Sequence, residues 1–293
     1  MPTAIVLGAS GPLGSYAVEH LVASGFEVVG VSRRPSAALP ASNIRWLTLD
    51  VTRNEDLEFL PPFCTLVSTL PVWATAQVCH VLRMRGAMRV VAFSSTSAVS
   101  KAEATSQDER ALSSRLLEGE RSLMAMTPDV STTIFRPTMI YSDRGDRNVE
   151  RLVRQVQGMS VFPAIGGGRG LRQPVHADDL AKAAVAALVN PMTIGRSYDL
   201  GGREVLSFRD MLSRAAKVNG VSVKFLPVPL NAAQWTLHTA RLLNLQLVRG
   251  IPAGALERMT KDLVCDIQKA EIDFGYSPRM FEPPRYVDGK VTL

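Results

Sequence analysis

The sequence has few cysteines and no long hydrophobic run. Its three cysteines, Cys64, Cys79 and Cys265, are odd in number and far apart, which excludes a disulfide framework and the spacing of a zinc site. No apolar run reaches the roughly 18 residues that span a bilayer, and the apolar stretch at 1–8 is too short for a signal peptide. We therefore expect a cytoplasmic protein with no bound metal and no membrane partner.

Aromatic residues are also scarce, at 6% of the 293 residues, although the chain is basic. It has 33 lysines and arginines against 27 acidic residues, a formal net charge of +6. The basic residues are not interleaved with aromatic ones and form no nucleic-acid-binding motif. The positive charge therefore predicts an anionic small molecule as partner, and no nucleic acid. The hydrophobic share of 46% is that of a globular chain with one large or two small domains.

Short apolar runs alternate with helical patterns through the first half of the chain. A buried strand followed by a helix, several times over, implies right-handed crossovers and a parallel sheet covered by helices on both faces. We therefore predict an α/β fold: a Rossmann-type doubly wound parallel sheet with a smaller C-terminal substrate-binding part. The predicted strands are Thr3–Leu7, Glu27–Ser32, Ile44–Leu49, Thr65–Thr69, Arg89–Ser94 and Ser131–Arg136, with helices at Leu13–Ser24, 74–84 and 108–125.

A glycine-rich segment, GASGPLG at 8–14, joins the first predicted strand to the first helix. Glycine at 8 and 11 allows a tight turn and a close approach of the backbone to phosphates, and glycine at 14 allows the helix to pack on the strand. The free N–H groups of a helix N-terminus suit a pyrophosphate, so we predict a dinucleotide site rather than a structural turn. The predicted cofactor contacts in this loop are Gly8, Ser10, Gly11, Pro12, Leu13 and Gly14.

The ends of the second and third strands indicate which dinucleotide binds. An NAD site places an acid about 20 residues after the loop, but this chain has Ser32, Arg33 and Arg34 there. Two guanidinium groups match the charge and geometry of a 2′-phosphate, so we predict NADP as the cofactor, with NAD as an alternative. The alternative role of the two arginines is that of a solvated loop. Asp50 and Val51 end the third strand, where we expect a contact with adenine; the alternative for Asp50 is a cap of the next segment.

Six motifs follow one another in the order of a known family. They are GASGPLG at 8–14, LDV at 49–51, FSSTSAV at 93–99, FRPTMIY at 135–141, PVHADDLA at 174–181 and YDLGG at 198–202. Over nearly its whole length the chain resembles the extended short-chain dehydrogenase/reductases, also called the NAD-dependent epimerase/dehydratase family. The resemblance implies hydride transfer on a nucleotide-diphosphate sugar or a similar carbonyl compound, and a homodimer as a common assembly.

The alternation of apolar runs and helical patterns ends after residue 142, where a stretch rich in glycine and arginine begins. Two helices follow at Ala177–Val189 and Ser207–Asn219, the second with Ser207 placed to cap it. We predict that residues 1–142, with 174–200 returning to them, form the NADP-binding Rossmann core. Residues 143–173 and 201–293 form the smaller substrate-binding part, and we expect the pocket between the two.

The resemblance also implies an active site, and there the chain departs from the family pattern. The family uses a serine or threonine at the end of the fifth strand and a Tyr-x-x-x-Lys pair on the next helix. Thr96 stands at the hydroxyl position, with Ser95 and Ser97 beside it as expected substrate contacts. The helix carries Ala111 and Arg115 at the tyrosine and lysine positions. Alanine removes the acid/base group, whereas Arg115 keeps a positive charge for the cofactor ribose.

Two later motifs supply the other candidates. Tyr141 is the phenol nearest to the nicotinamide by motif position, and its alternative role is packing. Pro137, in the same motif, is an expected cofactor contact. His176 and Asp178 have the residue types of an acid/base pair, but the family pattern favours a role at the start of a helix.

Six arginines lie between residues 144 and 172. Arg172 stands four residues before His176, where members of the family often carry an arginine bonded to the diphosphate of the sugar nucleotide. The resemblance therefore implies that Arg172 binds the substrate diphosphate. The alternative for most of these arginines is a solvated surface.

Two functions stay open at this point. The first is an NADP-dependent oxidoreductase or epimerase in which Thr96 orients the substrate oxygen and water or Tyr141 replaces the lost phenol. The second is a catalytically inactive NADP-binding sensor or scaffold protein. The retained Thr96 and Arg172 favour the first function, and the missing Tyr/Lys pair favours the second.

Overall fold

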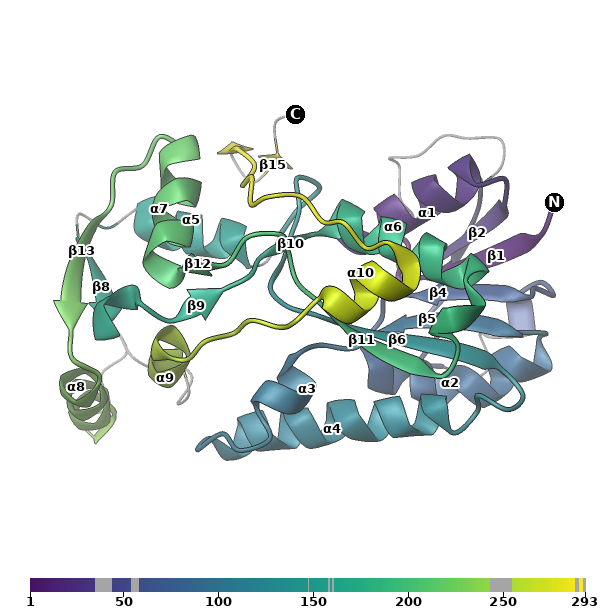
Figure 1. The fold of residues 1–293 in the computed structure, drawn as a ribbon, viewed down its shortest axis with the longest axis horizontal. Helices are drawn as coiled ribbons and strands as arrows, with labels where there is room; N and C mark the ends of the chain where they lie inside the picture. Colours follow the sequence, from purple (N-terminus) through teal and green to yellow (C-terminus); the bar gives the residue numbers. More distant parts are fainter. Residues whose placement is uncertain are drawn as a thin grey trace.

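The larger part of the molecule is a parallel sheet covered by helices (Figure 1). The computed structural model describes residues 1–34, 44–53, 58–146, 148–157, 159, 161–242, 255–287 and 290–291. The strand order is β11-β6-β5-β4-β1-β2-β3, and all neighbours in it are parallel. The strands are β1 (Thr3–Leu7), β2 (Glu27–Ser32), β3 (Ile44–Thr48), β4 (Thr65–Ser68), β5 (Arg89–Phe93), β6 (Ser131–Pro137) and β11 (Arg196–Leu200).

Helices cover both faces of this sheet. On one face α1 (Pro12–Ala23) packs beside α6 (Ala177–Val189), and on the other α2 (Val72–Met84) packs beside α4 (Gln107–Met124). The central strands are therefore buried on both faces, which explains their continuous apolar sequences. Within the described ranges, no helix combines the length and the apolar character that a membrane crossing requires.

The strand order changes direction at β1. β2 and β3 lie on one side of it, and β4, β5 and β6 lie on the other. At such a switch point the connections leave toward opposite faces, and a crevice opens beyond the carboxyl ends of the strands. The glycine-rich segment 8–14 follows β1, so the fold places the predicted phosphate loop where open parallel sheets bind their ligands.

The predicted fold class is confirmed, and the sequence pattern fails to reveal one strand of the seven-stranded sheet. The predicted strands and the first three predicted helices begin and end within about two residues of the observed ones. β11 is absent from the prediction because its sequence, RSYDL, mixes polar and apolar residues. It lies at the edge of the sheet beside β6, so it has no need of a continuous apolar run.

A smaller part, at the left of Figure 1, has a core of its own around two helices, α5 (Val149–Gln157) and α7 (Phe208–Val218). The hydroxyl of Ser207 accepts a hydrogen bond from the N–H of Asp210 at 3.0 Å, which confirms the predicted cap of α7. The other elements here are α8 (Leu230–Leu242), α9 (Ala255–Thr260) and the strand pairs β8 (Val161–Ile165) with β13 (Lys224–Val228) and β9 (Leu171–Arg172) with β12 (Leu206–Ser207). The pair β7 (Ile140–Tyr141) with β10 (Val175–His176) lies at the junction of the two parts, beside α6.

The C-terminal chain returns from the smaller part to the sheet. α10 (Gln268–Phe274) packs on β11 and α6, and Ala270 and Tyr276 belong to the buried cluster that includes α1 and α6. We expected all of 201–293 in the smaller part; the apolar side chains of this segment cover the edge strand of the sheet, and the division of the chain into two parts stays a prediction. The described chain ends with the pair β14 (Tyr286–Val287) and β15 (Lys290–Val291).

Candidate functional site

Many of the predicted site residues follow strands at one edge of the sheet. Because neighbouring strands are parallel, all of their carboxyl ends lie along this edge. Residues that are far apart in the sequence are thereby brought into one row. The loop 8–14 follows β1, Arg33 and Arg34 follow β2, Asp50 and Val51 follow β3, Ser95, Thr96 and Ser97 follow β5, and Pro137 ends β6.

The fold itself requires glycine at two positions of the 8–14 loop. Gly8 has a φ of +78°, and a Cβ on it would lie 2.5 Å from Oγ1 of Thr69. A Cβ on Gly14 would lie 2.2 Å from the carbonyl oxygen of Gly8. Gly11 has an ordinary φ of −77°, and the atom nearest to a Cβ there is 3.3 Å away. The fold has much less need of glycine at 11, which is the position where a pyrophosphate approaches the backbone in a dinucleotide site.

The N-terminus of α1 is left open by the residues around it. Gly11 precedes the helix and has no side chain to cap it, Pro12 occupies the first turn, and no acidic residue lies in that turn. The N–H groups of the first turn and the positive end of the helix dipole therefore face the carboxyl edge of the sheet, where an anion would satisfy them. The loop and the helix together fit the pyrophosphate of a dinucleotide.

The chain turns at the ends of β2 and β3. Arg33 and Arg34 are exposed there, and the hydroxyl of Ser32 donates a hydrogen bond to the carbonyl of Arg34. Asp50 accepts hydrogen bonds from the hydroxyl (2.7 Å) and the N–H (3.1 Å) of Thr52, and these bonds, with Arg33 nearby, hold its pKa below the usual range. Asp50 thus makes a local turn with Thr52, and its alternative role as a cap of the next segment is not tested by the described residues. Its contact with adenine stays a prediction.

The ends of β5 and β6 are bonded to each other at the predicted hydroxyl group. Thr96 begins the short helix α3 (Ser97–Ser100), and its N–H and its hydroxyl donate hydrogen bonds to the carbonyl of Pro137 at 3.1 and 3.3 Å. The hydroxyl of Ser95 accepts a bond from the N–H of Ser97 at 3.1 Å. One cluster therefore contains the predicted substrate contacts Ser95 and Ser97, the predicted catalytic hydroxyl of Thr96 and the predicted cofactor contact Pro137.

A buried acid anchors this cluster to α4. The carboxylate of Glu120 accepts a hydrogen bond from the hydroxyl of Ser94 at 2.5 Å, at the end of β5. It also accepts two bonds from Nε of Arg136 on β6, both at 3.0 Å. Since Glu120 is only 4% exposed, this charged pair fixes the helix against both strand ends.

The helix α4 presents no catalytic pair at the two positions that the resemblance indicates. Ala111 and Arg115 are both exposed. The guanidinium of Arg115 lies 4.5 Å from the ring centre of Trp73, near the start of α2. On the buried side, the hydroxyl of Ser113 donates a hydrogen bond to the carbonyl of Ala98 at 2.5 Å. The proposed contact of Arg115 with a ribose stays a prediction.

The phenol of Tyr141 is enclosed by the C-terminal chain. It is 1% exposed, and its ring lies 5.0 Å from those of His176 and Phe281. Its hydroxyl accepts a hydrogen bond from the N–H of Glu282 at 3.2 Å and donates one to the carbonyl of Met280 at 3.4 Å. Burial raises its pKa to about 12. This environment is that of the packing role that we gave as the alternative, and the catalytic role stays a prediction.

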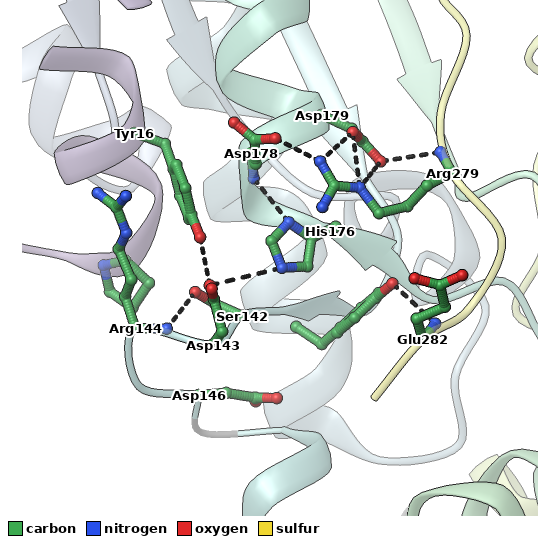
Figure 2. A network of polar contacts seen from close by, with 12 residues as sticks. Tyr16, Ser142, Asp143, Arg144, Asp146, His176, Asp178, Asp179, Arg279 and Glu282 are labelled. Carbon is green, nitrogen blue, oxygen red and sulfur yellow. Dashed lines mark hydrogen bonds and ion pairs between the residues drawn. The ribbon is translucent and has the colours of Figure 1, made fainter. Parts of the chain in front are cut away.

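Figure 2 shows a polar network between α1, the loop after β7 and the start of α6. Nδ1 of His176 accepts a hydrogen bond from the N–H of Asp178 at 3.2 Å, which confirms its expected role at the start of the helix. Nε2 of His176 lies 3.6 Å from the carboxylate of Asp143, which accepts a bond from the hydroxyl of Tyr16. Burial lowers the pKa of His176 and raises that of Tyr16. The network holds the loop against α1.

Asp178 joins three segments of the chain. It accepts bonds from His20 on α1 (2.5 Å), from Lys182 on α6 (2.8 Å) and from Arg279 of the C-terminal chain. Although partial burial opposes its ionisation, these partners hold the pKa of Asp178 far below the usual range. Arg279 also bonds the carboxylate of Asp179 at 2.9 Å. The start of α6 is therefore tied to α1 and to the C-terminal chain by ionic contacts.

The sequence pattern does not reveal Tyr16, Asp143 and Arg279 as partners of the site motifs. They come from three distant segments, and no spacing connects them. Asp143 stands two residues after the FRPTMIY motif, and this closeness to a site motif could have indicated a role for it near the site. Tyr16 and Arg279 carry no comparable signal.

Arg172 is buried in this structure. It is 3% exposed, and its Nη1 donates hydrogen bonds to the carbonyls of Leu171 (2.6 Å) and Lys261 (2.9 Å), while Nη2 donates to that of Arg258 (2.5 Å). Among the described residues, no carboxylate lies within ion-pair distance of it. Burial lowers its pKa to about 10. The nearby carboxylate of Asp262, which accepts a hydrogen bond from the N–H of Leu171 at 2.8 Å, partly offsets this burial; the diphosphate role of Arg172 stays a prediction.

A family model described as NAD dependent epimerase/dehydratase family matches residues 4–64 and 71–201, well over half of the chain. The chain belongs to this family. Among curated relatives of this epimerase/dehydratase chain, the uncharacterized protein y4nG of Sinorhizobium fredii is 26% identical over 152 residues. Mitochondrial NADH dehydrogenase [ubiquinone] 1 alpha subcomplex subunit 9 of Arabidopsis thaliana is 35% identical over 94 residues. The two matches cover 51% and 31% of this chain, but only 37% and 22% of the relatives' own lengths.

The fold is shared with solved structures of other proteins. UDP-glucuronic acid 4-epimerase of Bacillus cereus, solved in complex with UDP-glucuronic acid and NAD, superposes with a TM-score of 0.69 over 95% of both chains. Its sequence is 18% identical. This likeness shows a common architecture for the epimerase/dehydratase chain and that enzyme.

Proposed function

We propose that this chain binds NADP(H) and transfers a hydride to or from a nucleotide-diphosphate sugar or a similar carbonyl compound. The observation that carries the proposal is the open N-terminus of α1 behind the 8–14 loop, at the switch point of the sheet. The shared fold of an epimerase solved with NAD and a UDP sugar supports it. We place the protein in the cytoplasm, where its three free thiols are kept reduced, and a homodimer stays an expectation from the family.

The end of β2 supports NADP over NAD. Arg33 and Arg34 are exposed where an NAD site has an acid for the ribose 2′-hydroxyl. Guanidinium groups form charge-assisted hydrogen bonds with phosphate oxygens, and a pair of them suits a 2′-phosphate.

The residues of the sheet edge have separate roles in the proposed reaction. The loop would hold the pyrophosphate, and Pro137 and Arg115 would lie near the nicotinamide half of the cofactor. When bound, the nicotinamide supplies or accepts the hydride. The hydroxyl of Thr96 orients the substrate oxygen, with Ser95 and Ser97 beside it. Water or Tyr141 would replace the family's phenol in proton transfer; the main-chain bonds of the Tyr141 hydroxyl favour water.

A second candidate is an NADP-binding sensor or scaffold protein without catalysis. The helix α4 favours it, because Ala111 and Arg115 stand exposed where the family has its tyrosine and lysine. The partial match to a protein that is by its name a subunit of NADH dehydrogenase also supports it.

Turnover separates the two candidates. NADPH and NADH are titrated by fluorescence, and NADPH oxidation is then followed with a panel of 4-keto nucleotide sugars and aldehydes. Oxidation with any member of the panel supports hydride transfer. Tight NADPH binding without turnover across the panel supports the sensor, and binding of neither dinucleotide refutes both.

A further inference from the structure

The segment Arg258–Leu263, which we call the strap, covers Arg172. It begins inside α9 and runs beside β9, where Arg172 and Leu263 form a parallel bridge. Carbonyls of Arg258 and Lys261 accept the hydrogen bonds from the Arg172 guanidinium. The strap therefore occupies donors of Arg172 that an anionic ligand would use.

Glycine stands where the strap comes closest to the chain beneath it. A Cβ on Gly170 would lie 2.6 Å from the carbonyl oxygen of Met259 and 2.7 Å from that of Lys261. A Cβ on Gly166 would lie 2.7 Å from Cγ2 of Thr260. The GGGRG sequence before Arg172 thus allows the strap to lie directly on the backbone.

The side chain of Arg258 ties the strap to the sheet domain. It pairs with Glu109 in the first turn of α4. The same carboxylate lies 3.5 Å from Nζ of Lys101, directly after α3. The Glu109 side chain is 12% exposed, so this contact is better shielded from solvent than a typical surface ion pair. In Figure 1, α9 lies between α8 and the α3–α4 corner of the sheet domain.

We infer that the strap is a displaceable cover over Arg172, that the Glu109 pair acts as its latch beside the bonds of Asp262 and Leu263 to Leu171, and that a diphosphate-bearing ligand displaces it. Phosphate oxygens would replace the carbonyls of the strap at the Arg172 guanidinium. The same movement frees Arg258 and Lys101, which Glu109 otherwise neutralises. The identity of the ligand rests on the proposed function, whereas the latch rests only on the contacts of the strap.

The test replaces Glu109 with glutamine and measures access to Arg172 directly. Arg172 modification by phenylglyoxal is followed by peptide mass spectrometry, and UDP binding by calorimetry. The control is Glu150→Gln, which breaks a pair of similar exposure with Arg154 inside α5. We expect E109Q to be modified at Arg172 roughly three to ten times faster than the wild type and the control, and to bind UDP more tightly by a similar factor, because the open fraction rises. Arg258→Gln breaks the same pair from the other side and is expected to expose Arg172 equally.

The outcomes separate the latch from the ligand. Unchanged modification of Arg172 in both E109Q and R258Q overturns the latch, whatever UDP does. Faster modification with unchanged UDP affinity also overturns the inference, because the strap then does not control the site. Faster modification with no UDP binding by any variant upholds the latch and rejects the diphosphate of the proposed function.

Discussion

Single glycines of the phosphate loop have different physical roles. Gly14 lets the first turn of α1 lie against the carbonyl of Gly8, because a Cβ would come within 2.2 Å of that oxygen. Gly11 meets no such obstacle within the protein. Gly14 is therefore required by the fold, whereas the glycine at 11 is accounted for by the proposed pyrophosphate.

Alanine substitutions separate these two roles. We expect Gly14→Ala to lower the free energy of unfolding by about 1–3 kcal/mol through overpacking. We expect Gly11→Ala to melt close to the wild type but to bind NADPH at least about tenfold more weakly, since its methyl group lies where the backbone approaches the pyrophosphate. Thermal unfolding and fluorescence titration measure the two effects, and a Gly11→Ala variant with normal NADPH affinity would contradict the placement of the pyrophosphate.

The two arginines after β2 predict a change in cofactor preference. We expect the double variant Arg33→Ala, Arg34→Ala to bind NADPH roughly ten to a hundred times more weakly, because charge-assisted hydrogen bonds to the 2′-phosphate are lost. NADH affinity stays the same. Arg45→Ala, which removes an exposed arginine within β3, is the control. An equal loss of NADPH and NADH affinity would show that these arginines do not read the 2′-phosphate.

At the scale of elements, the sequence predicts the strands and helices that a local residue pattern marks. The buried strands β1, β2 and β5 are recognisable as apolar runs, and Ser207 marks the start of α7 because a cap acts within one turn. β11 escapes prediction since an edge strand is half exposed and its polar residues resemble a loop. The two-residue strands of the smaller part are formed by contacts between distant segments, which no local pattern encodes. The same reason hides the pairing of Tyr16 with Asp143.

The junction at Asp178 predicts a dependence of stability on pH. Its pKa in the folded protein lies below that in the unfolded chain, so the ionised carboxylate stabilises the fold above the unfolded pKa of about 3.9, and this contribution is lost as the pH falls further. We expect Asp178→Asn to be less stable than the wild type at neutral pH, and the difference to shrink as the pH is lowered below about 4.

Urea unfolding of both proteins at neutral and acidic pH measures this difference. Asp129→Asn is a matched control, because its pair with Arg83 is about half exposed on both sides and contributes little. A difference between Asp178→Asn and the wild type that stays constant with pH would mean that the ionisation of Asp178 does not link these segments.

In the whole molecule, the chain crosses repeatedly between the sheet and the smaller part. It leaves the sheet after β6, returns with α6 and β11, leaves again for α7, and returns with α10. Contacts of Arg279 with Asp178 and Asp179 fasten the last return. Since neither part is made from one continuous segment, we expect the two to unfold together.

This threading predicts a single thermal transition that moves as a whole when cofactor binds. At a concentration of 100 times its dissociation constant, NADPH is expected to stabilise the protein by about 2.7 kcal/mol. Calorimetric scans with NADPH and NADH at equal concentration measure the shift, and the larger shift is expected with NADPH. Two transitions, of which NADPH moves only one, would show that the parts unfold separately.

The place of β11 in the chain affects how the protein is made. A ribosome releases β6 before its neighbour at the sheet edge, Arg196–Leu200, has been synthesised. At roughly 5–20 residues per second, the interval lasts several seconds, during which β6 offers a row of unpaired N–H and C=O groups to other chains. Nascent chains that end between β6 and β11 are therefore expected to aggregate most readily and to depend most on chaperones.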